Sequence, residues 1–287
     1  MKKRKVTDMK KEALERSSIV FLLMMVMSLP LYAQDQTQAT NDWEFRLMPY
    51  FWMPSLDAEG TVGGPLGGSL SGNVDLNFGD VLDYLDFTAM GRMEAWKGKW
   101  GFTFDGIYMN LGADGSFQTR RGGGLSLDAD VRLGMADFGL AYRIYDQPFG
   151  EDDQQRLVFE PYGGLRYSYL RQKIDLNVNI AGVSSAGRTL GGSEDWVEPF
   201  VGGRVIWDLN DTWSLNVRGD AGGFGIGSAS DLTWQILGGV DYKITKSMIF
   251  NAGYRYVELD YSHGSGSDEL GIDLRAKGPY LGLTILF

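Results

Sequence analysis

The sequence holds one histidine and no cysteine, so few of its residues could carry out catalysis. His263 stands close to Ser265 and Asp268, and such a set could supply a base, a nucleophile and an orienting acid. The surrounding segment is rich in Gly and Ser, whereas catalytic groups need rigid support, so we do not expect an enzyme. An outer-membrane lipid hydrolase that uses His263 is kept as a third alternative for the function.

Metal, phosphate and nucleic-acid sites find little support in the sequence. Zinc would lack ligands in a chain with one His and no Cys, and the acidic run 151–153 has no calcium-loop spacing. The glycines at 122–124 follow two arginines without the strand-to-helix context of a phosphate loop. An isoelectric point near 4.7 argues against nucleic acid as a partner. We therefore predict no metal and no cofactor.

Charged residues that alternate with apolar ones indicate a different chemistry. In 213–223, Leu215 and Val217 share one parity with other apolar residues, and Arg218 and Asp220 stand on the other. A soluble sandwich would scatter Lys, Glu and Thr over its polar face, whereas rows of arginine beside acids, such as Arg166 with Glu160, suit a narrow lumen with paired charges. The predicted lumen-lining residues are Arg92, Glu94, Asp105, Arg166, Glu198, Arg204, Arg218, Asp220, Asp241 and Arg255.

The elements that position these residues are strands with a two-residue period. Eleven such segments occur: 43–54, 70–78, 87–97, 100–111, 125–144, 157–169, 197–209, 213–223, 232–242, 248–259 and 272–287. They predict an all-β, antiparallel transmembrane β-barrel. Because an outer-membrane barrel has an even number of strands, we expect twelve, with ten as the alternative.

Three segments depart from the simple period. Residues 79–86 place apolar residues at helical spacing after Asp80, which predicts a short helix, either a plug in the lumen or a surface turn. In 125–144 and 272–287 the apolar parity changes, near Gly134 and at Gly278-Pro279, and we expect a β-bulge at each place.

The connections predict which end of the barrel faces which side. Three short turns have aromatic residues on both sides, 96–100, 207–213 and 242–250, which is typical of periplasmic turns beside an aromatic girdle. Longer connections rich in Gly and Ser are expected to be extracellular loops: 57–69, 112–124, 171–194, 222–230 and 261–271.

The N-terminal segment has the pattern of a secretory signal peptide. Seven Lys/Arg residues precede an apolar run at 19–31 that ends in Leu31-Tyr32-Ala33. We predict cleavage after Ala33, so that 1–33 is the signal and 34–287 the barrel, with Met9 as an alternative start to Met1. The mature chain would keep 20 basic and 34 acidic residues, a net charge of −14.

The two ends of the barrel segment carry a family resemblance. The chain ends Gly278-Pro-Tyr-Leu-Gly-Leu-Thr-Ile-Leu-Phe287, which resembles the C-terminal strand of bacterial outer-membrane β-barrel proteins. The segment 43–54 and Tyr254-Arg-Tyr256 resemble poorly characterised members of the small OmpA-like barrel superfamily. The resemblance implies a bacterial outer-membrane protein that periplasmic chaperones and the barrel-assembly machinery handle, with an assembly signal formed by Leu281, Leu283, Ile285 and Phe287.

Two main functions follow for such a barrel. The first is a narrow porin-like channel for small solutes, with cations preferred over anions. The alternative is a non-conducting structural or interaction barrel whose loops bind lipid or an extracellular partner, because ten to twelve strands lie between a filled barrel and an open pore. Outer-membrane lipids and lipopolysaccharide are the expected partners, and arginines and a lysine near the outer rim could pair with their phosphates: Arg120, Arg121, Arg171, Lys173 and Arg188.

Overall fold

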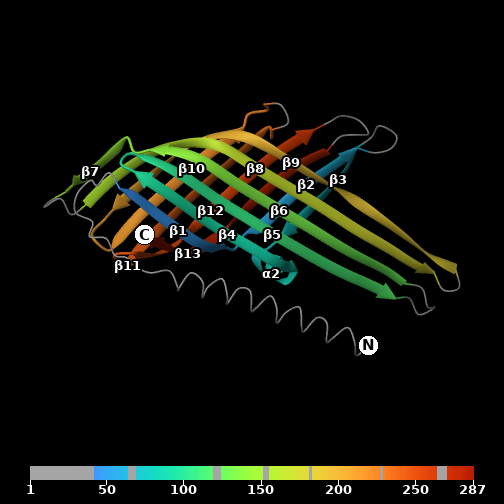
Figure 1. Cartoon of the computed structure of the whole chain (residues 1–287). Helices are drawn as coiled ribbons and strands as arrows, with labels where there is room; N and C mark the ends of the chain where they lie inside the picture. Colours follow the sequence, from blue (N-terminus) through green and yellow to red (C-terminus); the bar gives the residue numbers. More distant parts are fainter. Residues whose placement is uncertain are drawn as a thin grey trace. The chain divides into compact units, whose positions relative to one another are not determined.

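The computed structural model describes residues 42–63, 69–118, 124–150, 155–180, 183–226, 229–263 and 270–287 (Figure 1). The predicted signal peptide lies outside these residues. None of the helices in the described ranges is long and apolar enough to cross a bilayer. The elements are β1 (Trp43–Trp52), β2 (Ser55–Gly63), β3 (Ser69–Leu76), α2 (Phe78–Tyr84), β4 (Leu85–Lys97), β5 (Trp100–Gln118), β6 (Gly124–Tyr142), β7 (Tyr145–Phe149), β8 (Gln155–Ile180), β9 (Val183–Asp208), β10 (Trp213–Gly223), β11 (Leu232–Thr245), β12 (Met248–His263) and β13 (Leu270–Leu286).

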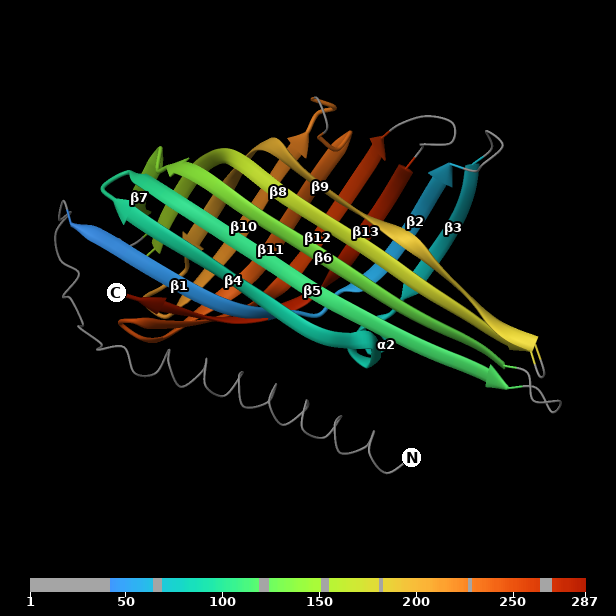
Figure 2. The same ribbon diagram turned by 45° about the vertical axis from the view of Figure 1, so that its right-hand side comes forward.

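Ten strands close into an antiparallel β-barrel. The order around the wall is β1-β4-β5-β6-β8-β9-β10-β11-β12-β13, and pairing of β1 with β13 closes it. Strands β2, β3 and β7 are not among these ten. Strand β2 pairs with β13 and with β3, and β7 pairs with β8. Figure 2 shows the tilted strands crossing the wall side by side. We call the end with the short turns and the last residue of the chain the turn end, and the opposite end the loop end.

The expectation of twelve strands is corrected to ten, the alternative. Strands β1 and β2 both pair with β13, one with its second half and one with its first, so together they cross the wall once. Strand β3 pairs with β2, and β4 pairs with β1, so β3, α2 and β4 also make a single crossing. Segment 70–78, which the sequence period marks as a separate crossing, is therefore half of one.

Three of the predicted loops are largely strands instead. In 57–69, strand β2 continues to Gly63 and β3 begins at Ser69. Strand β5 continues to Gln118 and β6 begins at Gly124, so most of 112–124 belongs to a hairpin. Strands β8 and β9, of 26 residues each, include most of 171–194. The glycine and serine content of these segments is typical of loops, but the hydrogen bonds between strands use backbone N–H and C=O groups, which these residues also supply.

The predicted β-bulges are also corrected. Strand β6 pairs with β5 and β8 without a shift in register around Gly134, and β13 pairs with β12 without a shift at Gly278-Pro279. The inward-facing parity stays the same along each strand. Apolar residues change parity because the interior changes from polar near the turn end to apolar nearer the loop end, where Leu133 and Leu274 pack against the buried apolar cluster.

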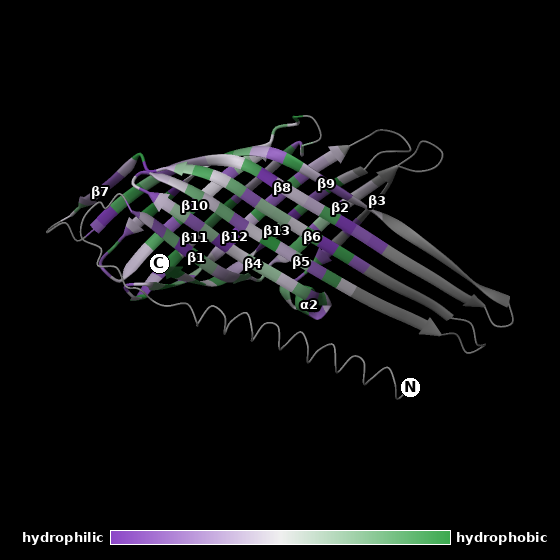
Figure 3. Cartoon of the chain, in the orientation of Figure 1, coloured by the Kyte–Doolittle hydropathy of each residue, from purple (hydrophilic) through white to green (hydrophobic). Residues whose placement is uncertain are grey.

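Apolar side chains cover the outer face of the barrel, and Figure 3 shows the alternation of hydropathy along the strands. Large apolar residues with at least 37% of their surface exposed occur on every barrel strand, and examples are Trp43, Phe45, Trp100, Phe102, Phe138, Leu165, Val201, Trp207, Val217, Trp213, Ile236, Val240, Tyr242, Phe250 and Leu281. Trp96, which was predicted in the aromatic girdle, is instead buried inside the barrel, 1% exposed. The outer face is thus suited to lipid contact.

The predicted helix forms at Phe78–Tyr84, and its N-cap is Asn77 rather than Asp80. Asn77 Oδ1 accepts hydrogen bonds from the backbone N–H groups of Gly79 and Asp80, and Asp80 Oδ2 accepts one from the Asn77 N–H, which makes a capping box. The helix contacts β2, β3 and β5, and of its side chains Val81 enters the apolar cluster. It thus lies at the wall and contributes one side chain to the interior.

Candidate functional site

The ten residues predicted to line the lumen lie on the inward-facing parity of β4, β5 and β8 to β12. Arg166, Glu198 and Arg255 are 0% exposed, so these charges have left water completely. A buried charge is costly unless it is paired and hydrogen-bonded. Their partners therefore determine what the interior can do.

The first cluster, the Arg166 cluster, comprises Asp137, Arg166, Asp220 and Gln235 from β6, β8, β10 and β11. Arg166 donates to both carboxylate oxygens of Asp137 over 2.7 and 2.9 Å, and to Asp220 Oδ1 over 2.5 Å. Gln235 Nε2 donates to Asp137 and Asp220 over 3.0 and 2.9 Å. These bonds join side chains from four strands and fill the interior at this level.

The second cluster, the Arg218 cluster, comprises Tyr50, Asp105, Arg218 and Arg255. Arg218 Nη1 donates to Asp105 Oδ2 over 2.9 Å, and the Tyr50 hydroxyl donates to Asp105 Oδ1 over 2.8 Å. Arg255 Nη1 donates to the Tyr50 hydroxyl over 2.8 Å. Tyr162 links the two clusters, because its hydroxyl donates to Asp220 and accepts from Arg218.

The third cluster, the Arg204 cluster, lies nearer the turn end. Arg204 binds Glu94 through two hydrogen bonds of 2.6 and 3.0 Å and reaches Glu160 Oε2 over 2.7 Å. Arg143 Nε donates to Glu160 Oε1 over 3.0 Å, and its guanidinium lies over the Trp96 ring at 4.3 Å. Each carboxylate here is held by at least one guanidinium, which compensates its burial.

The pairing differs from that expected along single strands. Arg166, expected beside Glu160 of its own strand, instead binds Asp137 of β6 and Asp220 of β10. Sequence reasoning placed Glu160 in the lumen but with the wrong partner, and it missed Asp137, Gln235, Tyr50 and Tyr162 as members of these clusters. Their signal was present, since each occupies the inward parity of its strand, but partners on other strands depend on the register.

Part of the β10–β11 connection packs against the interior of the barrel. Within it, Ser230 is fully buried and its hydroxyl donates to Glu198 Oε2. Trp196 Nε1 donates to the same oxygen over 3.0 Å, and its ring stacks on Tyr261 at 4.3 Å between centroids. This connection therefore covers the Glu198 carboxylate from the loop side.

An apolar layer adjoins the ion-pair clusters. It consists of buried residues from β1, β2, α2, β5, β11, β12 and β13: Trp52, Leu56, Val81, Ile107, Met109, Leu111, Leu237, Val257, Ala276 and Tyr280. Trp52 Nε1 donates to the Gly278 carbonyl over 3.1 Å, so its single polar atom is satisfied. With this layer and the clusters, side chains fill much of the barrel interior.

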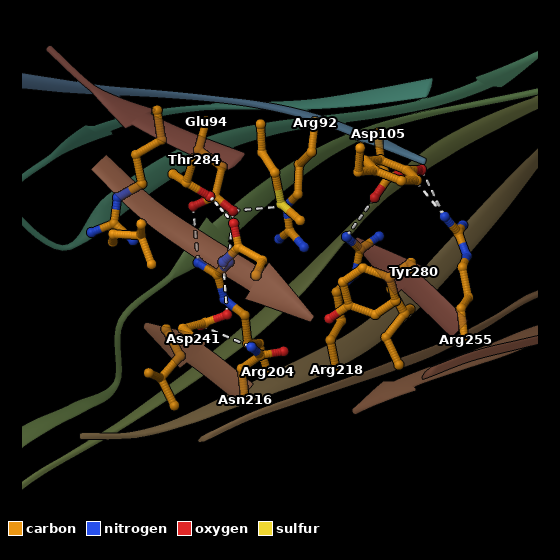
Figure 4. A pocket seen from close by; sticks show the side chains of 17 residues that line it. Arg92, Glu94, Asp105, Arg204, Asn216, Arg218, Asp241, Arg255, Tyr280 and Thr284 are labelled. Atoms are coloured by element: carbon orange, nitrogen blue, oxygen red, sulfur yellow. Dashed lines mark hydrogen bonds and ion pairs between the residues drawn. The ribbon is translucent and has the colours of Figure 1, made fainter. Parts of the chain in front are cut away.

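A chamber of about 100 Å³ remains inside the barrel near the Arg204 and Arg218 clusters (Figure 4). Arg46, Ile206 and Thr284 line it close to the turn ends of their strands. Arg92, Asp241 and Tyr280 also line it. Charged side chains of both signs thus border free volume inside the barrel.

Most residues of the weaker site candidates lie outside the part of the chain that the structure describes. His263 is the last residue of β12, and Ser265 and Asp268 of the hydrolase hypothesis lie outside the described residues, as do 151–153 and 122–123. In the part of the chain that the structure describes, no group of three His, Cys, Asp or Glu side chains is arranged to hold a metal ion.

The residues of the predicted assembly signal lie on β13 and at its end. Leu281 and Phe287 are 46% and 38% exposed, whereas Ile285, expected to face outwards with them, is 7% exposed. Ile285 pairs with Leu47 on one side and Met248 on the other. Neighbouring strands on both sides therefore flank the C-terminal segment.

Comparison with known proteins gives structural likeness only. No family model matches the sequence, and no curated protein matches it. Among solved structures, the chain is similar to the outer membrane protease OmpT of Escherichia coli, with a TM-score of 0.48, 10% identity, and 88% of this chain and 99% of that one covered. It is also similar to the translocator domain of the autotransporter NalP of Neisseria meningitidis, with a TM-score of 0.34, 14% identity and 97% of each chain covered. A third is Ail of Yersinia pestis, with a TM-score of 0.29, 9% identity, and 86% and 100% covered.

Proposed function

We propose that this chain is an integral β-barrel of the bacterial outer membrane that has no open pore and acts through its outer surface. Two features support the membrane location. The outer face is covered by exposed apolar side chains, and aromatic residues such as Trp100 and Trp213 gather at the turn end. The signal peptide predicted for residues 1–33 would deliver the chain to the periplasm.

The Arg166 cluster is the observation on which we choose between the two predicted functions, the porin-like channel and the non-conducting barrel. Arg166, Asp137 and Gln235 are at most 2% exposed and join strands from different parts of the wall. A water-filled path through the interior would have to separate Arg166 from its carboxylate partners. Leaving such buried charges unpaired is costly. The interior therefore favours the non-conducting barrel over the porin-like channel.

The outer rim supplies a surface for the expected lipid partners. Arg132 of β6 and Arg171 of β8 stand directly opposite each other, just beyond the apolar part of the wall. Like charges directly opposite each other are destabilising, and Asp130 pairs with only one of them, Arg132, over 2.9 Å. We infer that this pair binds phosphate groups of outer-membrane lipid or lipopolysaccharide, beside Lys173.

Planar-bilayer recording of the refolded chain tests the closed interior. We expect no current steps from the wild-type protein, after heat-modifiable gel migration has shown that it is folded. A triple variant, Asp137→Ala, Arg166→Ala and Gln235→Ala, removes the side chains that cross the interior and should produce steps. The matched control Arg275→Gln, an exposed residue, should stay silent.

Reproducible steps from the wild-type protein would overturn the proposal. If their size changed in Arg218→Gln or Glu198→Gln, the current would pass through the barrel interior, and the porin-like channel would replace the closed barrel.

A further inference from the structure

Two donors that line the chamber make no hydrogen bond with a described residue. Arg92 Nε forms an ion pair with Glu94 Oε1 over 2.7 Å without a hydrogen bond, and the two terminal nitrogens of Arg92 bind no residue that the structure describes. The Tyr280 side chain is 5% exposed, yet no hydrogen bond joins its hydroxyl to any residue that the structure describes. Figure 4 shows the Arg92 guanidinium and the Tyr280 ring at the edge of the same chamber.

The wall across the chamber carries the opposite charge. Asp241 accepts hydrogen bonds from Asn216 Nδ2 over 2.8 Å and from Asn251 Nδ2 over 2.7 Å. Thr284 in turn donates to Asn251 Oδ1 over 2.7 Å, which fixes the amide orientation. The two amides hold the Asp241 carboxylate in place without neutralising it, and within the described ranges no guanidinium or ammonium is paired with it.

Arg92 and Asp241 therefore border one chamber as a cation and an anion with unused capacity. They come from β4 and β11, which are separated by three strands along the shorter way around the wall. A guanidinium has five N–H donors and binds a carboxylate through two of them. A carboxylate held by two amides can still accept from an ammonium group.

We propose that this chamber binds a compact zwitterion of the α-amino-acid class. The carboxylate of the ligand accepts from Arg92 and from the Tyr280 hydroxyl, and its ammonium group donates to Asp241. Such a ligand leaves the net charge of the chamber unchanged, whereas a simple anion or cation would satisfy one wall and repel the other.

The volume of the chamber restricts the size of the ligand, and the residues that line it indicate from which end the ligand would enter. A volume of about 100 Å³ accepts a solute of a few heavy atoms and excludes a sugar or a nucleotide. Arg46 and Thr284 line the chamber within three residues of their strand ends, so the ligand would enter from the turn end. The proposal does not depend on conductance, because the Arg166 cluster can close the barrel beyond the chamber.

Equilibrium dialysis of the refolded full chain with radiolabelled glycine tests the proposal. We expect saturable binding of one glycine per chain, with an affinity at least about tenfold lower in Arg92→Gln and in Asp241→Asn. Acetate and methylammonium, each with one of the two charges, should compete more weakly than unlabelled glycine. The control Arg275→Gln should bind as the wild type does.

Tyr280→Phe serves as a second variant, because it keeps the ring and removes only the hydroxyl. It should fold, as shown by heat-modifiable migration, and bind glycine more weakly. Absence of saturable binding to the wild-type chain would overturn the proposal. So would glycine binding that is unchanged in the folded variants, or competition by acetate as strong as that by glycine.

Discussion

Arg166 and Asp137 face each other directly across β8 and β6 and share two hydrogen bonds, with side chains that are 0% and 3% exposed. Asp220 receives a third bond from the same guanidinium. One arginine thus compensates two buried carboxylates, and the stability of the barrel depends on it more than on any exposed charge.

Arg166→Met should destabilise the barrel by about 3–5 kcal/mol. It removes the hydrogen-bonded cation of the buried Asp137 and Asp220 and leaves them only the longer ion pairs with Arg218, at 3.7 and 3.8 Å. Urea unfolding in lipid vesicles, followed by tryptophan fluorescence, measures the change. The control Arg275→Met removes an exposed ion pair with Glu258 and should change stability far less than Arg166→Met does. Equal effects of the two variants would contradict the role assigned to Arg166.

The Arg204 and Glu94 pair should show strong coupling in a double-mutant cycle. Arg204→Gln leaves Glu94 with only Arg92 as its cation, and Glu94→Gln leaves Arg204 with only Glu160 as its anion, whereas the double variant removes both members of the pair. We expect the double variant to be more stable than additivity predicts, by at least about 1.5 kcal/mol. The partly exposed pair of Arg46 and Glu44 at the turn end provides the reference cycle, and its coupling should be below about 1 kcal/mol. Additive effects for Arg204 and Glu94 would show that each acts through other neighbours.

Gly164 permits a close approach between β8 and β6. A Cβ at this position would lie 1.9 Å from the Phe138 carbonyl oxygen, which is backbone and cannot move aside. Gly164→Ala should therefore lower the unfolding free energy by more than about 1 kcal/mol or prevent folding. At Gly238, a Cβ meets nothing within 4 Å, so Gly238→Ala is the matched control and should be neutral or slightly stabilising. Folded yield in the gel-migration assay compares the two, and equal yields would refute the steric argument.

The outward apolar face was predictable from sequence because it repeats every two residues. Leu165, Val201, Val217 and Ile236 are exposed on the parity that the period assigned to them. The sequence predicted that the strands close into a barrel, but it did not predict the number of strands. Segment 70–78 has the same period as a full crossing, and only its pairing with β2 alone shows that it is part of one.

The inward face was harder to interpret. Leu133 and Leu274 occupy the polar parity of their strands, and sequence reasoning assigned this change to bulges. The two-residue period alone cannot distinguish a β-bulge from an apolar stretch of the interior. In both cases the apolar residues change between odd and even positions along the strand. The partners of Arg166 were also inaccessible, since they lie 29 and 54 residues away and come together only through the register.

Asp146 should make the attachment of β7 to the barrel dependent on pH. Burial alone would raise the pKa of this carboxyl, but hydrogen bonds from Arg156 over 2.7 and 2.8 Å lower it below its usual value. A lowered pKa stabilises the folded state above the unfolded pKa of about 3.9, and this stabilisation is lost as pH falls through the folded value. Asp146→Asn should therefore be less stable than the wild type at pH 6, by less than about 1 kcal/mol, and the difference should vanish near pH 2. Unfolding free energies at both pH values test this, and a difference that grows in acid would reverse the assigned sign.

The opposed Arg132 and Arg171 should determine how the barrel binds lipid phosphate. Arg132 pairs with Asp130 over 2.9 Å, whereas Arg171 has no ion pair with any residue in the described part of the chain, so Arg171 has more capacity for a phosphate. Arg171→Gln should weaken binding of lipopolysaccharide micelles by about three- to tenfold, and more at low salt than at 0.5 M salt, because exposed charges are screened. Arg156→Gln, an exposed arginine at the turn end, is the matched control and should bind as the wild type does. Dephosphorylated lipopolysaccharide separates phosphate recognition from general adhesion to lipid. Wild-type protein that binds both forms equally would exclude the phosphate site.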